Sequence, residues 1–219
     1  MPGSSLWLLP PKSHPLAPLL PPLLTRTAHH FTSPHTFLPH ITLTSEIPPS
    51  THSPDPQAWL DALPLPAASS VVVKLGPLAS EPVFFRKLYA RVEKAGVAEL
   101  GAVARAAVPG FEGRGEAREW VEGVYVPHLS LLYFMLLLFS GLALGASDEW
   151  ARERLSLAPS HECPQVGAEG LAEVEKFVRE AGINLEGEGD MGGWVGGRVV
   201  LVPTDRAIKD WAPIAEREL

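Results

Sequence analysis

Two five-residue segments share one pattern that specifies two short strands, each with one polar face. They are PHITL at residues 39–43 and PHLSL at residues 127–131. Because successive side chains of a strand point to opposite faces, the histidine and the hydroxyl of each segment share one face. The two apolar residues share the other. Each strand is therefore expected to bury its apolar face and to present an imidazole beside a hydroxyl.

The rest of the chain predicts a mixture of strands and helices without a regular βαβ alternation, which favours an α+β fold. Prolines crowd the first 82 residues, and we expect Pro18, Pro21 and Pro22 to prevent a long helix there, leaving at most a short one after Pro22. Strand patterns occur at 5–9, 37–44, 70–75, 125–133 and 198–202, and helical patterns occur at 56–63, 93–108, 116–123 and 171–181.

The two motifs suit the hydrolysis of a cyclic phosphate ester. This reaction needs a base for the attacking water and an acid for the leaving oxygen, and histidine titrates near neutral pH, so His40 and His128 can fill both roles. The hydroxyls of Thr42 and Ser130 can donate to phosphate oxygens as charge develops. We expect no metal and no cofactor. In the alternative interpretation, both histidines are ordinary strand residues without a catalytic role.

Composition limits the kind of partner. The 219 residues carry a net charge of −7, and a broad nucleic-acid surface needs a basic face. We therefore expect no binding of bulk nucleic acid. A few local donors are enough for one phosphate, so a small phosphorylated ligand is compatible with this charge.

Five segments of the chain resemble, in the family's order, the fungal cyclic phosphodiesterases of the two-histidine phosphoesterase superfamily. The resemblance implies one domain over residues 1–219 with a two-lobed, pseudo-twofold α+β fold. In such a fold antiparallel sheets line a central cleft, helices lie outside, and each lobe supplies one motif. The segments are SLWLLPP (5–11), PHITLTS (39–45), VPHLSLLY (126–133), GGRVVLVPT (196–204) and IKDWAPIAEREL (208–219).

The resemblance also implies an activity. Enzymes of this family hydrolyse nucleoside 2',3'-cyclic phosphates to 2'-phosphates. They also open ADP-ribose 1'',2''-cyclic phosphate, a by-product of tRNA splicing, to ADP-ribose 1''-phosphate. These small molecules are the expected partners, and we expect a monomeric, cytoplasmic protein, with Golgi association as the alternative.

Site roles follow from the resemblance residue by residue. His40 and His128 become the catalytic pair, with His128 activating water and His40 protonating the leaving oxygen. Thr42 and Ser130 become phosphate-binding residues, and Tyr133 is expected at the edge of the cleft.

One segment departs from the family pattern. The family has Ser-Asp directly after the motif tyrosine, whereas here FMLLLFSGLALGA at 134–146 precedes Ser147-Asp148. We expect an atypical apolar insertion or a gene-model artefact, and membrane contact through this segment is the less favoured interpretation. Two functional alternatives stay open: a related phosphoesterase acting on 2'-5' linkages or RNA ends, and an inactive membrane-associated paralogue.

Overall fold

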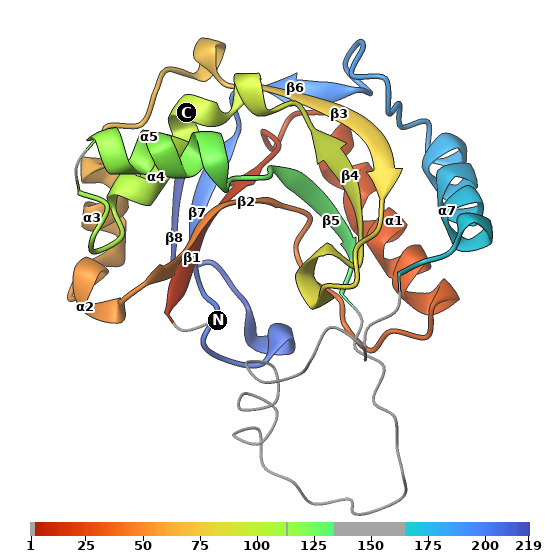
Figure 1. The fold of residues 1–219 in the computed structure, drawn as a ribbon, viewed down its shortest axis with the longest axis horizontal. Helices are drawn as coiled ribbons and strands as arrows, with labels where there is room; N and C mark the ends of the chain where they lie inside the picture. The colour runs from red at the N-terminus through yellow and green to blue at the C-terminus, as the bar shows by residue number, and fades with distance from the viewer. Residues whose placement is uncertain (1–2, 113, 134–164) are drawn as a thin grey trace, which may run out of the picture.

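The computed structural model describes residues 3–112, 114–133 and 165–219. Its centre is one curled, antiparallel eight-stranded sheet in the order β6-β3-β4-β5-β2-β1-β7-β8 (Figure 1). The α+β prediction is confirmed. The strands are β1 (Ser4–Leu9), β2 (Ile41–Ile47), β3 (Val72–Ala79), β4 (Leu88–Val92), β5 (His128–Leu132), β6 (Gly193–Val195), β7 (Arg198–Pro203) and β8 (Ala215–Glu218).

The strand order places the two motif strands at the centre of the sheet. Four strands, β6-β3-β4-β5, lie on one side of this centre, and β2-β1-β7-β8 lie on the other. The two halves meet where β5 pairs with β2 through Ile41 and Leu129. Each half of the sheet therefore supplies one histidine motif.

Helices cover one face of the sheet. In Figure 1, α4 and α5 pack together over one half, whereas α1 and α7 lie side by side over the other. A large apolar core fills the space between these helices and the sheet, and it includes the motif residues Ile41, Leu43, Leu129 and Leu131. The helices are α1 (Leu16–His30), α2 (Pro49–His52), α3 (Pro56–Ala62), α4 (Ala98–Ala106), α5 (Arg114–Gly123) and α7 (Ala168–Glu180), with short 3-10 turns η1 (Ala68–Ser70), η2 (Phe84–Arg86), η3 (Lys94–Gly96) and η5 (Ile208–Asp210).

The opposite face carries a smaller apolar cluster. Trp7 and Leu9 of β1 pack there against Val200 and Val202 of β7, with Trp211 against them. The apolar side of both motifs faces the helices, so their polar side shares the face with this cluster. The helix-free face of the two central strands is therefore where the predicted chemistry must lie.

The expectation of a broken helix after residue 15 is wrong. Helix α1 is continuous over 15 residues and contains Pro21 and Pro22. Pro18 lies in the first turn, where a backbone N–H has no intrahelical partner in any case. The two later prolines each remove one hydrogen bond, and burial of an apolar face offsets that loss. This face is formed by Leu16, Leu20, Leu23 and Leu24.

Most other elements lie near their predicted positions. Asp55 caps α3, which was predicted over 56–63, since its carboxylate accepts a hydrogen bond from the backbone N–H of Ala58 at 3.0 Å. Two strands were not predicted from the sequence: β6, which lies in a glycine-rich stretch, and β8, whose sequence AERE has no strand pattern.

The apolar segment 134–146 lies outside the described residues, so its predicted status as an insertion stays a prediction. Among the residues that are described, none of the helices is long and apolar enough to cross a membrane.

Candidate active site

The sheet brings the two motifs side by side. Strands β2 and β5 are antiparallel neighbours with Ile41 opposite Leu129. In this register His40 lies opposite Ser130, and Thr42 lies opposite His128. All four polar side chains therefore belong to one face, as the alternation within each motif predicted, and each histidine has the hydroxyl of the other motif as its cross-strand neighbour.

His40 is enclosed by aromatic rings. It is 1% exposed, and its imidazole stacks on the indole of Trp7 with ring centroids 3.6 Å apart and planes at 11°. Its Nδ1 lies 2.5 Å from the carbonyl oxygen of Leu38, so Nδ1–H donates to that oxygen and Nε2 carries the lone pair. Burial lowers the pKa of His40 to about 3, although the hydrogen bond to Leu38 opposes the shift and His128 adds to it. His40 is therefore neutral at physiological pH.

His128 repeats this backbone arrangement. Its Nδ1 lies 2.8 Å from the carbonyl oxygen of Val126, which, like Leu38, stands two residues before its histidine. Nε2 of His128 is therefore the nitrogen that Val126 leaves without a bond, as Leu38 does for Nε2 of His40. Burial is the largest influence on the pKa of His128 and lowers it, while the hydrogen bond to Val126 opposes that shift. The backbone thus presents the same imidazole nitrogen in both motifs.

The two motif hydroxyls have different surroundings. Ser130 is 2% exposed, and its Oγ donates to the carbonyl oxygen of Phe85 at 3.4 Å. Thr42 is half-buried, and its backbone carbonyl accepts a hydrogen bond of 3.2 Å from the hydroxyl of Tyr125. Tyr125 lies just before β5 in the chain and Thr42 near the start of β2, so this bond joins the beginnings of the two motif strands.

Tyr133 lies over His40 and is only 3% exposed. Its ring stacks on Phe37 at 4.1 Å and on Phe84 at 5.6 Å, and its hydroxyl lies 3.3 Å from Nε2 of His40. Burial raises the pKa of Tyr133 to about 12, with Ser130 acting in the opposite direction. The residue expected at the cleft edge thus contacts a predicted catalytic nitrogen directly.

Two contacts cover one histidine and one hydroxyl of the motifs. The phenol of Tyr133 faces Nε2 of His40, and the η2 turn places the Phe85 carbonyl against Ser130. Nε2 of His40 and Oγ of Ser130 therefore both have partners within the protein.

Two aromatic residues contact the motif histidines, and neither contact was predicted from the sequence. Trp7 stacks on His40. The ring of Tyr89 meets His128 edge-on at 5.1 Å. A lone aromatic residue carries no signal of this kind in a single sequence, because the contact depends on which strands become neighbours.

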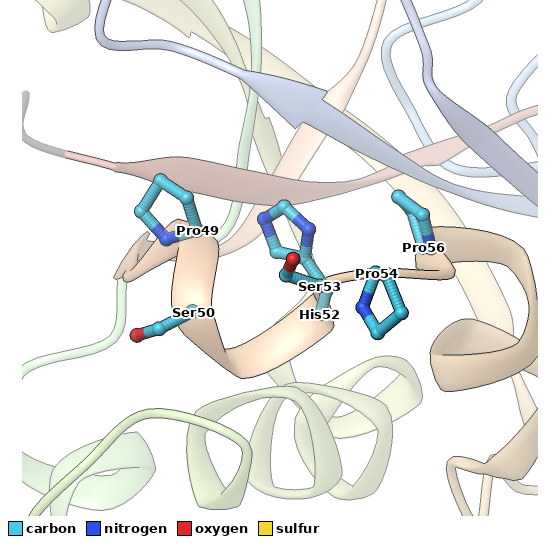
Figure 2. A pocket seen from close by; sticks show the side chains of 6 residues that line it. All are labelled: Pro49, Ser50, His52, Ser53, Pro54 and Pro56. Carbon is cyan, nitrogen blue, oxygen red and sulfur yellow. The ribbon is translucent and has the colours of Figure 1, made fainter.

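A pocket of about 320 Å³ lies elsewhere, beside α2 (Figure 2). The ring of His52 points from α2 toward β1, where its Nε2 lies 3.1 Å from Oγ of Ser4. This contact joins the α2 segment to the first strand, and none of the motif residues contributes to the pocket. The lining residues are Pro49, Ser50, His52, Ser53, Pro54 and Pro56.

The two histidine motifs thus lie side by side on adjacent antiparallel strands, with two imidazoles and two hydroxyls on one face of the sheet. The model of the family described as "Cyclic phosphodiesterase-like protein" matches residues 1–219. The chain therefore belongs to the cyclic phosphodiesterase-like family, as the sequence resemblance predicted.

Two curated relatives match over the full length of both chains, and each is named 2',3'-cyclic-nucleotide 3'-phosphodiesterase. The protein from Phaeosphaeria nodorum is 50% identical over 220 residues. The protein from Neurospora crassa is 37% identical over 242 residues.

Proposed function

We propose that this protein is a 2',3'-cyclic-nucleotide 3'-phosphodiesterase that converts nucleoside 2',3'-cyclic phosphates to 2'-phosphates. The observation that carries the proposal is the juxtaposition of the two motifs across the β2–β5 pair, with a histidine opposite a hydroxyl twice. Family membership and the shared name of both full-length relatives support the same reaction.

In the proposed mechanism His128 and His40 have complementary roles. His128 takes a proton from water through Nε2 while the water oxygen forms a bond to phosphorus. The bond between phosphorus and the 3' oxygen breaks, and protonated His40 gives its Nε2 proton to that oxygen. Thr42 and Ser130 donate to the non-bridging oxygens, whose negative charge increases in the transition state. The products are a 2'-phosphate and a 3'-hydroxyl, and both protons are accounted for.

The low pKa of His40 gives this mechanism a testable consequence. A neutral His40 cannot act as an acid, but an anionic phosphate close to it favours the imidazolium and raises its pKa. The pH dependence of kcat/KM reflects pKa values of the free enzyme, and that of kcat reflects pKa values of the enzyme–substrate complex. The pH above which kcat decreases should therefore be higher than the pH above which kcat/KM decreases. If both decrease at the same pH, His40 is not the acid.

The same ring opening applies to a second substrate, ADP-ribose 1'',2''-cyclic phosphate, with ADP-ribose 1''-phosphate as the product. A net charge of −7 favours such small nucleotides over RNA. The direct test incubates the protein with adenosine 2',3'-cyclic phosphate, ADP-ribose 1'',2''-cyclic phosphate, a 2'-5'-linked dinucleotide and an RNA with a 2',3'-cyclic end. Hydrolysis of the first two, with 2'-phosphate as the nucleotide product, is the expected result. Exclusive cleavage of the dinucleotide or the RNA end would replace the proposal with one of its rivals.

A further inference from the structure

One row of residues crosses the sheet through both motifs. Arg91 of β4 is the register partner of His128, and Trp7 of β1 is the register partner of Thr42. Because Ile41 pairs with Leu129, Thr42 and His128 are themselves opposite each other. From β4 to β1 the row therefore consists of a guanidinium, the two motif residues and an indole.

The alternation of β4 places Arg91 on the same face as the catalytic residues. Leu88, Ala90 and Val92 belong to the core beneath the helices. Tyr89 and Arg91 consequently point to the other face, and the edge-on contact of Tyr89 with His128 at 5.1 Å confirms that direction for Tyr89. Burial raises the pKa of Tyr89, whereas the charges of Arg91 and Arg86 lower it, so both guanidinium groups act on this part of the site.

Arg91 differs from Arg86 in having no counter-charge among the residues that the structure describes. Arg86 is paired with Glu81 at 2.8 Å. Arg91 is exposed, and within the described part of the chain its side chain forms no ion pair and no hydrogen bond. An unpaired guanidinium beside a phosphate-handling site can bind a phosphate through two parallel hydrogen bonds.

We propose that Arg91 forms an anion subsite beside His128 that binds a second phosphate of the substrate, so that the enzyme selects cyclic nucleotides carrying a 5'-phosphate over those with a free 5'-hydroxyl. This inference rests on the proposed phosphodiesterase function. The scissile phosphate lies among the four motif side chains of β2 and β5. Arg91 lies one strand further out, about 4.8 Å away along the sheet and on the side of His128 remote from β2, so it meets a different group of the substrate.

The test measures kcat/KM for adenosine 2',3'-cyclic phosphate with a 5'-hydroxyl and with a 5'-phosphate. The parental protein should prefer the 5'-phosphate, and Arg91→Gln should lower the ratio of the two values roughly tenfold, the size expected for one charge-assisted hydrogen bond. Arg91→Lys should keep part of the preference, and added salt should reduce it. Arg118→Gln is the matched control, because this exposed arginine pairs with Glu99 on the helix layer, and it should leave the ratio unchanged.

Two kinetic outcomes would overturn the subsite. If Arg91→Gln lowers both values equally, Arg91 acts on the scissile phosphate or on folding, and if neither value changes, no second phosphate is bound there. Calorimetric titration with adenosine 2'-phosphate and adenosine 2',5'-bisphosphate tests the subsite without catalysis. The bisphosphate should bind more tightly to the parental protein, and the difference should shrink in Arg91→Gln; equal affinities would reject the subsite. Failure of all hydrolysis together with this difference in binding would reject the proposed function alone.

Discussion

The hydroxyl of Tyr133 lies 3.3 Å from Nε2 of His40, on the nitrogen that remains free because Nδ1 donates to Leu38. The phenol thus holds the position that the leaving oxygen of a substrate takes in the proposed mechanism. Ring stacking with Phe37 and Phe84 keeps Tyr133 in place independently of this hydrogen bond.

Replacing Tyr133 with phenylalanine separates these two contributions. Tyr133→Phe keeps the stacked rings and removes one buried hydrogen bond, so the free energy of unfolding should fall by about 1 kcal/mol. The kcat should change by less than about tenfold, because His40 and not the phenol transfers the proton. Urea unfolding and steady-state kinetics measure both effects. A loss of kcat as large as that caused by removing His40 would instead make the phenol a participant in proton transfer.

Stability should depend on pH through His40. Its pKa is about 3 in the folded state and about 6.5 in the unfolded chain, so the unfolded state binds more protons between these values. The contribution of His40 is fully present above pH 6.5 and is lost as pH falls. Between pH 7 and pH 5 the free energy of unfolding should fall by about 2 kcal/mol from this residue.

Denaturant unfolding at the two pH values checks that decrease. His40→Gln should have a smaller decrease, since glutamine does not titrate. His128, whose pKa is also lowered, contributes in the same direction and remains in the variant. An identical pH dependence in the parental protein and in His40→Gln would show that His40 is not neutral and buried in solution.

Activity should survive chelation of metals. Two imidazoles and two hydroxyls provide acid, base and hydrogen-bond donors for a cyclic phosphate without an ion. Within residues 3–112, 114–133 and 165–219, the structure brings no three histidine, cysteine, aspartate or glutamate side chains into a metal-binding group. The assay compares untreated protein with protein dialysed against EDTA. Complete loss of activity, restored by Zn²⁺ or Mn²⁺, would reject the proposed mechanism.

The local part of the site could be predicted from the sequence, and the long-range part could not. Strand alternation within each motif was enough to place His40 with Thr42 and His128 with Ser130. No pattern within one chain specifies that β2 and β5 become neighbours, and the register of Arg91 with His128 depends on that pairing. The covering of Ser130 by the Phe85 carbonyl likewise arises from a 3-10 turn 45 residues away in sequence.

The fold shows the same division. Helices α3 and α7 follow local sequence patterns, and both were predicted. The continuity of α1 through Pro21 and Pro22 was missed, because local propensity disfavours it and burial of four leucines against the sheet overrides that propensity. Strand β8 is specified by pairing with β7 and not by its own sequence.

The central claim is that His40 and His128 act as one acid–base unit, and replacing each with glutamine tests it most directly. His40→Gln and His128→Gln should each lower kcat on adenosine 2',3'-cyclic phosphate by roughly 100-fold or more, and the double variant should be little worse than either. His30→Gln is the control, since His30-Phe31-Thr32 resembles a motif but lies at the end of α1 and should leave kcat unchanged. Circular dichroism confirms folding of each variant. Near-parental activity in either folded single variant, or multiplicative losses in the double variant, would contradict the account.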